Sequence, residues 1–179
     1  MATSAPASTL EVRRLSTIGE AQLQALADVL VDCVEGGASV SFMLPMTRDK
    51  ALAFWRKVAD GVARGERVLL VAEDAQGIAG TVQVILDQPE NQPHRADVAK
   101  MLVHRRARRQ GLGAALMQAA EREALREGKT LLVLDTADDT AARLYARLGW
   151  QPAGVIPRYA LLPAGGECAT TYFYRSLAD

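Results

Sequence analysis

The chain has 179 residues, a length that suits one domain with a single sizeable core and would be cramped for two. About half of its residues are hydrophobic and 23% are charged, which is ordinary for a soluble protein. Its 21 basic residues balance its 21 acidic ones, which argues against nucleic acid or an anionic membrane as the main partner. Because the first residues carry no apolar signal and no apolar run could span a bilayer, we expect a cytoplasmic protein.

The hydrophobic spacing alternates between the periods of strands and helices along the whole chain. In chain order it predicts a strand at 9–16, helices at 19–35 and after Thr47, a hairpin of strands 67–73 and 78–87, a strand at 95–103, a helix at 112–128, a strand at 130–136, a short helix at 138–149, and strands at 151–162 and 169–177. This order predicts one α/β (α+β) domain over residues 1–179, with a mixed central sheet and a flexible start at 1–8. Cys33 and Cys168 are far apart in the sequence and are expected to be free thiols.

A glycine-rich loop, Arg108-Arg109-Gln110-Gly111-Leu112-Gly113, stands between a predicted strand and a predicted helix. It fails as a dinucleotide fingerprint because Leu116 occupies the place of the third small residue. A second candidate, Gly128-Lys129-Thr130, fails as a P-loop because position 123 is glutamate and a strand follows. The first loop has the form R/Q-x-x-G-x-G/A, which would bring free helix N–H groups and an arginine to a diphosphate. With no lysine or metal-binding carboxylate in the loop, such a group would be held and not cleaved, as suits coenzyme A. The alternative is a plain glycine-rich turn into a helix.

The segment from Val103 to Met117 (VHRRARRQGLGAALM), followed by LLVLDT and TAARLYARLGW, resembles the GNAT family of acetyl-CoA-dependent N-acetyltransferases over residues 65–175. Within that family, EGGASVSFM, RADVAKMLV, LLVLDT and GVIPRYALLPAGG are similar to the tabtoxin-resistance acetyltransferases. The resemblance implies helices on both faces of the sheet and a splay between the parallel strands 95–103 and 130–135. The pantetheine arm of acetyl-CoA would enter this gap.

The family pattern also implies which residues hold the cofactor. The backbone of Leu102 and Val103 would pair with pantetheine, and the diphosphate would lie on Arg108, Arg109, Gln110, Gly111, Leu112, Gly113 and Ala114. The sequence departs from the pattern at three positions: arginine replaces a common proline at 105 and a common glycine at 109, and Asp138 replaces the usual asparagine. Whether the charge of Asp138 helps or hinders cofactor binding is left open.

Acetyl transfer from a thioester to an amine requires an amine that has lost a proton, a polarised carbonyl and a protonated leaving thiolate. The sequence has no GxSxG elbow and no cysteine beside a histidine, so we expect direct attack by the amine. Two carboxylates are base candidates. Strand alternation would put Asp97 on the face of Ala99, Met101 and Val103, where burial would raise its pKa; the alternative is an ion pair with Arg95 or Lys100.

Asp135 follows a hydrophobic strand and is expected to bind or deprotonate the amine, with a capping role beside Thr136 as its alternative. Tyr145 is the candidate acid for the leaving thiolate, since a phenol has an ordinary pKa near that of a thiol; otherwise it is a core residue. His94 and His104 belong to no metal motif, and we predict no metal.

The resemblance places the loop between the first two helices, and the last strands, over the acceptor. Together with Asp135, the candidate acceptor-binding residues are Glu35, Ser39, Phe42, Trp55, Tyr159 and Tyr172, each of which could instead be core or surface. The predicted enzyme acetylates a small amine, such as an antibiotic or toxin, and is a monomer or homodimer. The alternatives are an acceptor at a protein N-terminus or lysine, favoured by an open peptide groove, and a non-catalytic acyl-CoA-binding module.

Overall fold

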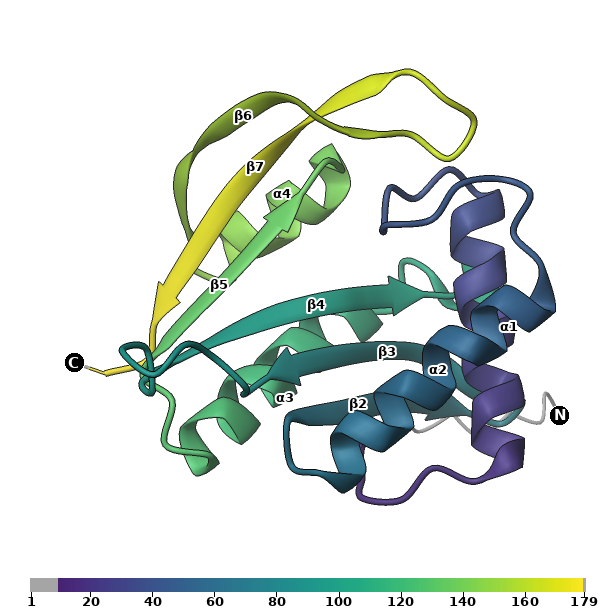
Figure 1. Cartoon of the computed structure of the whole chain (residues 1–179), viewed down its shortest axis with the longest axis horizontal. Helices are drawn as coiled ribbons and strands as arrows, with labels where there is room; N and C mark the ends of the chain where they lie inside the picture. Colours follow the sequence, from purple (N-terminus) through teal and green to yellow (C-terminus); the bar gives the residue numbers. More distant parts are fainter. Residues whose placement is uncertain (1–9, 179) are drawn as a thin grey trace, which may run out of the picture.

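The computed structural model describes residues 10–178, so the expected flexibility of residues 1–8 lies outside it. Its elements follow the predicted order, as Figure 1 shows. They are β1 (Glu11–Leu15), α1 (Glu20–Glu35), α2 (Arg48–Ala63), β2 (Arg67–Asp74), β3 (Gly77–Ile85), β4 (Arg95–Val103), the short 3-10 helix η1 (Arg105–Ala107), α3 (Leu112–Arg126), β5 (Leu131–Thr136), α4 (Asp139–Arg147), β6 (Gln151–Leu161) and β7 (Glu167–Ser176). None of the helices in this part of the chain has the length and apolar character needed to cross a bilayer.

The seven strands form one sheet in the order β1-β2-β3-β4-β5-β7-β6. Neighbouring strands are antiparallel except β4 and β5, which are parallel. The predicted mixed sheet is therefore confirmed, with a single parallel pair at its centre.

Two cores lie on opposite faces of the sheet, because alternate strand residues point to opposite sides. On one face, Leu26, Leu30 and Trp55 from α1 and α2 pack on Leu69 and other residues of the sheet. On the other face, α3 and α4 bury a separate set that ends in Tyr145, Trp150 and Phe173. Figure 1 shows α1 and α2 in front of the sheet and α3 behind it.

The parallel pair separates soon after it begins. Residues 95–97 of β4 pair with residues 131–133 of β5, and no pairing follows toward the carboxyl ends of the two strands. Figure 1 shows β5 rising away from β4 together with the β6–β7 hairpin. The expected splay is present, and it leaves one backbone edge of β4 free for a ligand.

A bulge in β4 changes which residues share a face. The pairing with β3 shifts between Thr81 and Gln83, and Lys100 has a left-handed φ of 52°. An extra residue in one strand reverses the alternation beyond it. Ala96 and Val98 lie in the α3-side core, and so do Met101 and Val103, although the two pairs are three residues apart.

Asp97 therefore does not share a face with Met101 and Val103, as simple alternation predicts. It lies on the other side of the sheet, which we call the acceptor face: the α1–α2 side of β4, β5 and β7, with Asp97, Lys100, Asp135 and Tyr172. The reversal at Lys100 is the physical reason for this correction.

Candidate functional site

The loop before α3 presents unpaired backbone donors. Gly111 occupies the N-cap position of α3, but it has no side chain that could accept a bond, so this helix end is uncapped. The first turn of the helix holds no acidic residue. The first turn closes with the bond from Ala115 N to Gly111 O at 3.1 Å, so the N–H groups of Leu112, Gly113 and Ala114 have no partner within the helix. Such an end, with the positive pole of the helix dipole, is suited to an anion.

The two loop glycines have different structural roles. Gly111 has a φ of +82°, and a Cβ on it would meet nothing within 4 Å, so it faces open space. Gly113 is closely packed, since a Cβ there would come within 3.0 Å of Leu144 Cδ2 in α4. Only Gly111 is required by the shape of the loop itself; Gly113 lets α3 and α4 approach each other.

The arginines before and within the loop divide into two groups. Arg105 donates to Asp32 at 2.7 Å and Arg106 pairs with Asp74, so these two hold the loop base to α1 and β2. Arg108 and Arg109 are exposed and form no ion pair with any acid of residues 10–178. The free positive charge is therefore concentrated beside the uncapped end of α3, where Gln110 is exposed as well.

The last two residues of β4, Leu102 and Val103, have different contacts. Leu102 is buried in the α1–α2 core. The Val103 carbonyl accepts a bond from Arg108 Nε at 3.2 Å and one from Cys33 Sγ at 3.5 Å. A pantetheine amide that pairs with this carbonyl would take the place of the Arg108 donor. His104 caps η1, with Nδ1 accepting from Arg106 N at 3.1 Å, which is a structural role.

Tyr145 lies at the α4 side of the splay. Its ring is 5% exposed and packs edge-on against Phe173, with ring centroids 5.9 Å apart. Burial, followed by the charges of Asp138 and Asp135, raises the pKa of the Tyr145 phenol. The phenol therefore holds its proton more tightly than a free tyrosine does.

The acceptor face carries Asp135 beside two tyrosines. Asp135 accepts a bond of 2.7 Å from Thr170 Oγ1 and is paired in the sheet with Tyr172. The Tyr172 and Tyr159 hydroxyls lie 2.8 Å apart. This hydrogen bond, together with burial and the charges of Asp135 and Asp97, raises the pKa of Tyr172 to about 12. Three of the predicted residues, from strands β5, β6 and β7, thus meet at one place.

Asp97 is differently placed from the buried base that its strand position predicts. Its side chain is 38% exposed and forms an ion pair with Arg95, and Gln88 Nε2 donates to it at 3.2 Å. This matches the alternative of an ion pair with Arg95. Its carboxylate is tied to two partners, whereas Asp135 is held by one hydroxyl.

Asp138 has a local structural role. Its carboxylate accepts bonds from Thr140 N at 2.6 Å and Ala141 N at 3.0 Å, which makes it the N-cap of α4. Thr136 Oγ1 accepts from Asp138 N at 3.0 Å. The cap thus belongs to Asp138, and Asp135 is left free of the capping role considered for it.

Three other predicted acceptor residues, Phe42, Ser39 and Trp55, lie in different environments. Phe42 packs edge-on against Phe54, with ring centroids 5.3 Å apart. Ser39 donates to the Leu161 carbonyl at 3.4 Å and joins the α1–α2 loop to the hairpin. Trp55 is fully buried in the α1–α2 core, so the core alternative holds for it.

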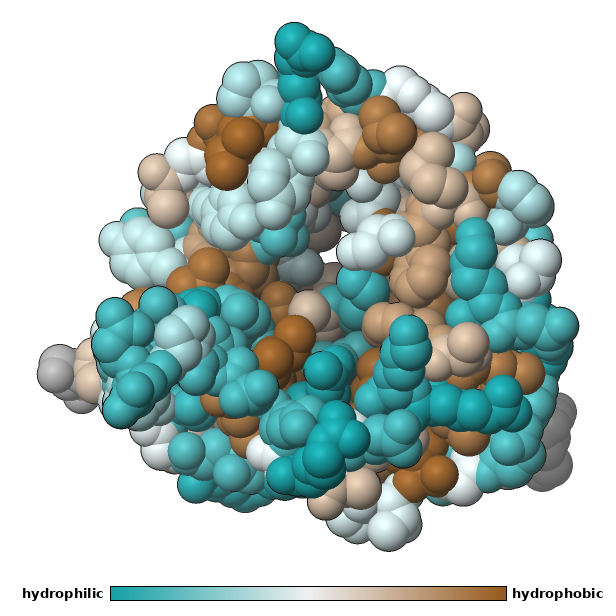
Figure 2. Space-filling model, in the orientation of Figure 1, coloured by the Kyte–Doolittle hydropathy of each residue, from teal (hydrophilic) through white to brown (hydrophobic). Residues whose placement is uncertain are grey.

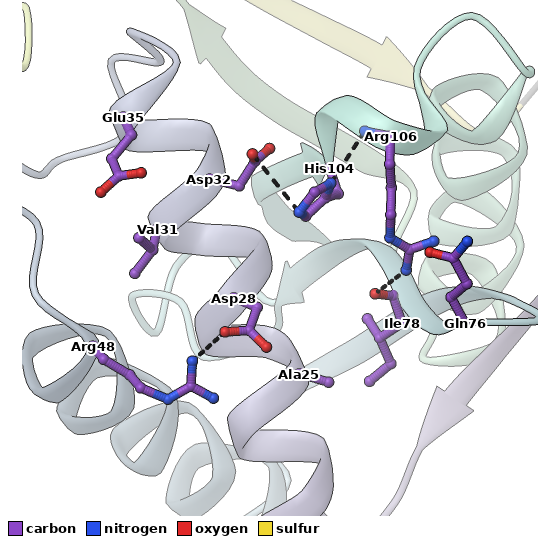
Figure 3. Close-up of a pocket in the computed structure, with 10 residues that line it drawn as sticks. All are labelled: Ala25, Asp28, Val31, Asp32, Glu35, Arg48, Gln76, Ile78, His104 and Arg106. Carbon is purple, nitrogen blue, oxygen red and sulfur yellow. Dashed lines mark hydrogen bonds and ion pairs between the residues drawn. The ribbon is translucent and has the colours of Figure 1, made fainter.

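Glu35 lies in a separate pocket of about 450 Å³ beside α1. Figure 3 shows Arg48 bonded to Asp28 there, and His104 facing Asp32. The charges of this pocket largely neutralise one another. Its walls come from α1, the first residue of α2, the β2–β3 turn with Ile78, and His104 and Arg106 just after β4, and its lining includes no residue of β4 or β5 themselves. It is therefore separate from the gap between β4 and β5, and Glu35 is not brought together with Asp135.

Sequence reasoning missed Lys100 as a site residue. The bulge turns its side chain onto the acceptor face, where Nζ donates to Ser41 Oγ at 3.1 Å and lies 5.8 Å from the centre of the Phe54 ring. A signal was present in the strand ADVAKMLV: its apolar residues change phase around a lysine. A phase change at a charged residue is what a bulge produces.

Comparison with known proteins agrees with this geometry. Residues 65–152 match the sequence model of the acetyltransferase (GNAT) domain. An N-acetyltransferase from Staphylococcus aureus Mu50 superposes with a TM-score of 0.79 at 17% identity, covering 96% of this chain and 100% of its own. A ribosomal-protein-alanine N-acetyltransferase from Brucella melitensis gives 0.78 at 20% identity, with coverage of 93% and 99%.

A GNAT superfamily phosphinothricin acetyltransferase from Sinorhizobium meliloti, solved in complex with AcCoA, gives a TM-score of 0.78 at 16% identity, covering 95% of this chain and 89% of its own. Identities this low establish the shared fold. The uncapped end of α3, the two unpaired arginines and the splayed strands fit acetyl-CoA as the bound group.

Proposed function

We propose that this chain, whose residues 65–152 match the acetyltransferase (GNAT) domain, is an acetyl-CoA-dependent acetyltransferase that moves the acetyl group by direct attack onto a primary amine of a small molecule. Amine-bearing antibiotics, toxins and related metabolites are the acceptors that we propose to test first, as the likeness to tabtoxin-resistance enzymes suggests. The preference for a small acceptor is carried by one observation, the contact between the α1–α2 loop and the β6–β7 hairpin.

These two segments meet above the acceptor face. Leu44 N donates to Pro163 O at 2.9 Å, and Ser39 Oγ lies 3.4 Å from Leu161 O and 3.7 Å from Cys168 Sγ. A polypeptide acceptor needs a groove open at both ends, and these contacts bridge such a path. Figure 2 shows the hollow that remains on this side, below the hairpin. A bridged hollow favours a small molecule over a protein terminus.

We assign the proton transfers to Asp135 of β5 and Tyr145 of α4. Acetyl-CoA supplies the reactive thioester. The Asp135 carboxylate binds the acceptor ammonium and takes its proton, directly or through water, so that the nitrogen lone pair can form the C–N bond. Thr170 fixes the orientation of that carboxylate. As the C–S bond breaks, the Tyr145 hydroxyl donates a hydrogen bond to the sulfur. The nitrogen of the new amide loses its second proton to water, and the thiolate takes a proton from water.

Asp135 is the preferred base because Asp97 is bound to Arg95 and Gln88. On this proposal, Asp135→Asn lowers kcat by at least about 100-fold, the usual contribution of a positioned base. Asp97→Asn lowers kcat far less and leaves the affinity for acetyl-CoA unchanged. The reverse order of the two effects would make Asp97 the base.

The test of the proposed function is acetyl-CoA-dependent thiol release with two panels of acceptors. One panel contains small primary amines, amino acids and amine-bearing antibiotics, and the other contains peptides with free N-termini or internal lysines. We expect turnover with members of the first panel and a kcat/KM at least about tenfold lower with every peptide. Turnover confined to peptides would overturn the small-molecule proposal, and no turnover with any amine would favour an acyl-CoA-binding module.

A further inference from the structure

We propose that Lys100 binds an anionic group of the acceptor, so that the enzyme's substrates are amino acids or analogues with a carboxylate close to the reacting amine. This inference rests on the proposed function and specifies its substrate class. It is carried by the position of Lys100 at the bulge, by its partners and by the charge on the opposite side of the splay.

The backbone turns this side chain toward the acceptor. Lys100 adopts a φ of 52°, a left-handed conformation that is strained for a residue with a Cβ. Because the bulge places Ala99 and Lys100 in succession on one face, the side chain leaves the α3-side core and lies on the acceptor face. A strained conformation that moves a cation into a cleft is typical of a functional position.

The cation lacks a carboxylate partner. Its Nζ donates to the neutral hydroxyl of Ser41 at 3.1 Å and faces the Phe54 ring, and no acid in residues 10–178 lies within ion-pair distance of it. By contrast Arg95, the other cation of β4, is paired with Asp97. An ammonium carries three donors, so Lys100 has donors left for a ligand.

Burial lowers the pKa of Lys100, and the charge of Asp135 partly opposes that shift. The ammonium is thus poorly solvated, and an incoming anion would replace some of the lost solvation. A desolvated cation without a partner attracts an anion more strongly than an exposed one does.

Lys100 and Asp135 lie on opposite sides of the gap between β4 and β5, and their charges interact without a direct ion pair. An amino acid carries the complementary pair, an ammonium and a carboxylate joined by one carbon. Its ammonium would bind Asp135, the group assigned to take the proton, and its carboxylate would bind Lys100. This arrangement holds the amine in a single orientation toward the thioester.

The first test compares matched acceptors with the wild-type enzyme. Each amino acid that is turned over is paired with its own carboxamide, which keeps the amine and loses the anionic charge. We expect kcat/KM to be roughly 10- to 100-fold higher for the carboxylate, the range for a hydrogen bond between charged groups. Equal values for the two members of each pair overturn the inference while the proposed function stands.

The second test changes Lys100. Lys100→Met keeps the length of the side chain and removes its charge. It should raise KM for the carboxylates by roughly the factor that separates carboxylates from carboxamides in the wild type. The KM for the carboxamides and the affinity for acetyl-CoA should stay nearly unchanged. Lys100→Arg should retain most of the preference. If the methionine variant folds poorly, Lys100→Asn removes the charge in the same way, because asparagine tolerates the left-handed backbone.

A general-base role for Lys100 gives a different result. Carboxylates and carboxamides would then lose kcat equally in Lys100→Met, and the preference for carboxylates would be the same as in the wild type, which overturns the inference. If the wild-type enzyme releases thiol with no small amine at all, the proposed function fails and the inference fails with it.

Discussion

The conformation of Gly111 links a single residue to cofactor binding. Its φ of +82° lets the chain turn from the loop into α3 with the first N–H groups facing outward, and the space where a Cβ would stand is open. Any other residue would strain this turn, and relief of the strain would move the donors. We therefore assign to Gly111 the shape of the diphosphate site.

Gly111→Ala should weaken acetyl-CoA binding about tenfold, because left-handed strain of about 1–2 kcal/mol is relieved by moving the N–H groups. The matched control is Gly77→Ala in the β2–β3 turn, where φ is +106° and the space is equally open. Both variants should lose similar stability in chemical denaturation. Calorimetry should find a changed Kd for Gly111→Ala alone; the same Kd in both variants would place the diphosphate elsewhere.

In the proposed mechanism, Tyr145 assists the leaving thiolate. Tyr145→Phe keeps the ring packing on Phe173 and Trp150 and removes the hydroxyl, so kcat should fall by at least about tenfold while the Kd for acetyl-CoA changes little. A kcat equal to that of the wild type would leave this tyrosine with a packing role only.

The raised pKa of Tyr145 also predicts how kcat depends on pH in the alkaline range. Because the phenol holds its proton above its ordinary value of 10.0, its ionisation cannot reduce kcat near pH 10. Any alkaline loss of kcat in that range should therefore be equally present in Tyr145→Phe. An alkaline limb in the wild type that vanishes in the variant would contradict the buried, protonated phenol.

At the scale of elements, α4 positions Tyr145 and depends on two contacts, one at its start and one in its second half. Asp138 caps its first turn, and Leu144 packs on Gly113 at the beginning of α3. The helix has nine residues, too few to be stable without capping and packing. The orientation of the phenol therefore depends on both ends of this short segment.

Replacing the cap tests that dependence. Asp138→Ala should lower the free energy of unfolding by about 1 kcal/mol and reduce kcat together with it, because the first turn of α4 frays. Asp138→Asn keeps an oxygen acceptor, so stability and kcat should remain near the wild type. Thermal melting and steady-state kinetics measure the two effects, and an equal loss in both variants would show that charge, and not capping, is the contribution of Asp138.

At the scale of the molecule, the proposed acceptor site is enclosed by two segments that are far apart in the sequence. Ser39 follows α1 and Cys168 lies in β7, yet their side-chain atoms are 3.7 Å apart. This contact allows the hairpin to be fixed to the α1–α2 loop by a single substitution.

Ser39→Cys should form a disulfide with Cys168 on oxidation, seen as a reduction-sensitive change in mass. The oxidised form should bind acetyl-CoA as before and acetylate bulky amines more slowly than small ones, because the entrance cannot widen. Ser39→Cys/Cys168→Ser is the control that cannot crosslink. Unchanged rates for all acceptors in the crosslinked enzyme would mean that they enter by another route.

Local sequence was sufficient for the elements and for the cofactor loop. Helices and strands fell close to their predicted ranges because each carries its own hydrophobic period and its own end signal, as with Thr47 at the start of α2. The loop from Arg108 to Gly113 was recognisable because its glycines and its arginines act through neighbouring backbone. The likeness to the GNAT family followed from that motif together with the segments after it, and residues 65–152 match the acetyltransferase (GNAT) domain.

The surroundings of the candidate residues depended on the tertiary structure. Simple alternation misplaced Asp97 because one left-handed residue, Lys100, reverses the faces of β4, and it is the pairing with β3 that locates the bulge. Trp55 and Glu35 were indistinguishable from acceptor residues until α1 and α2 were packed on the sheet.

The chain's own pattern thus determined which elements form and which loop can hold a diphosphate, since both depend on residues that are neighbours in sequence. Tertiary packing alone decided which carboxylate stays free of an ion pair, where the side chain of Lys100 points and how the proposed acceptor site is enclosed. These properties arise between segments such as the α1–α2 loop and the β6–β7 hairpin, whose contact no local period encodes.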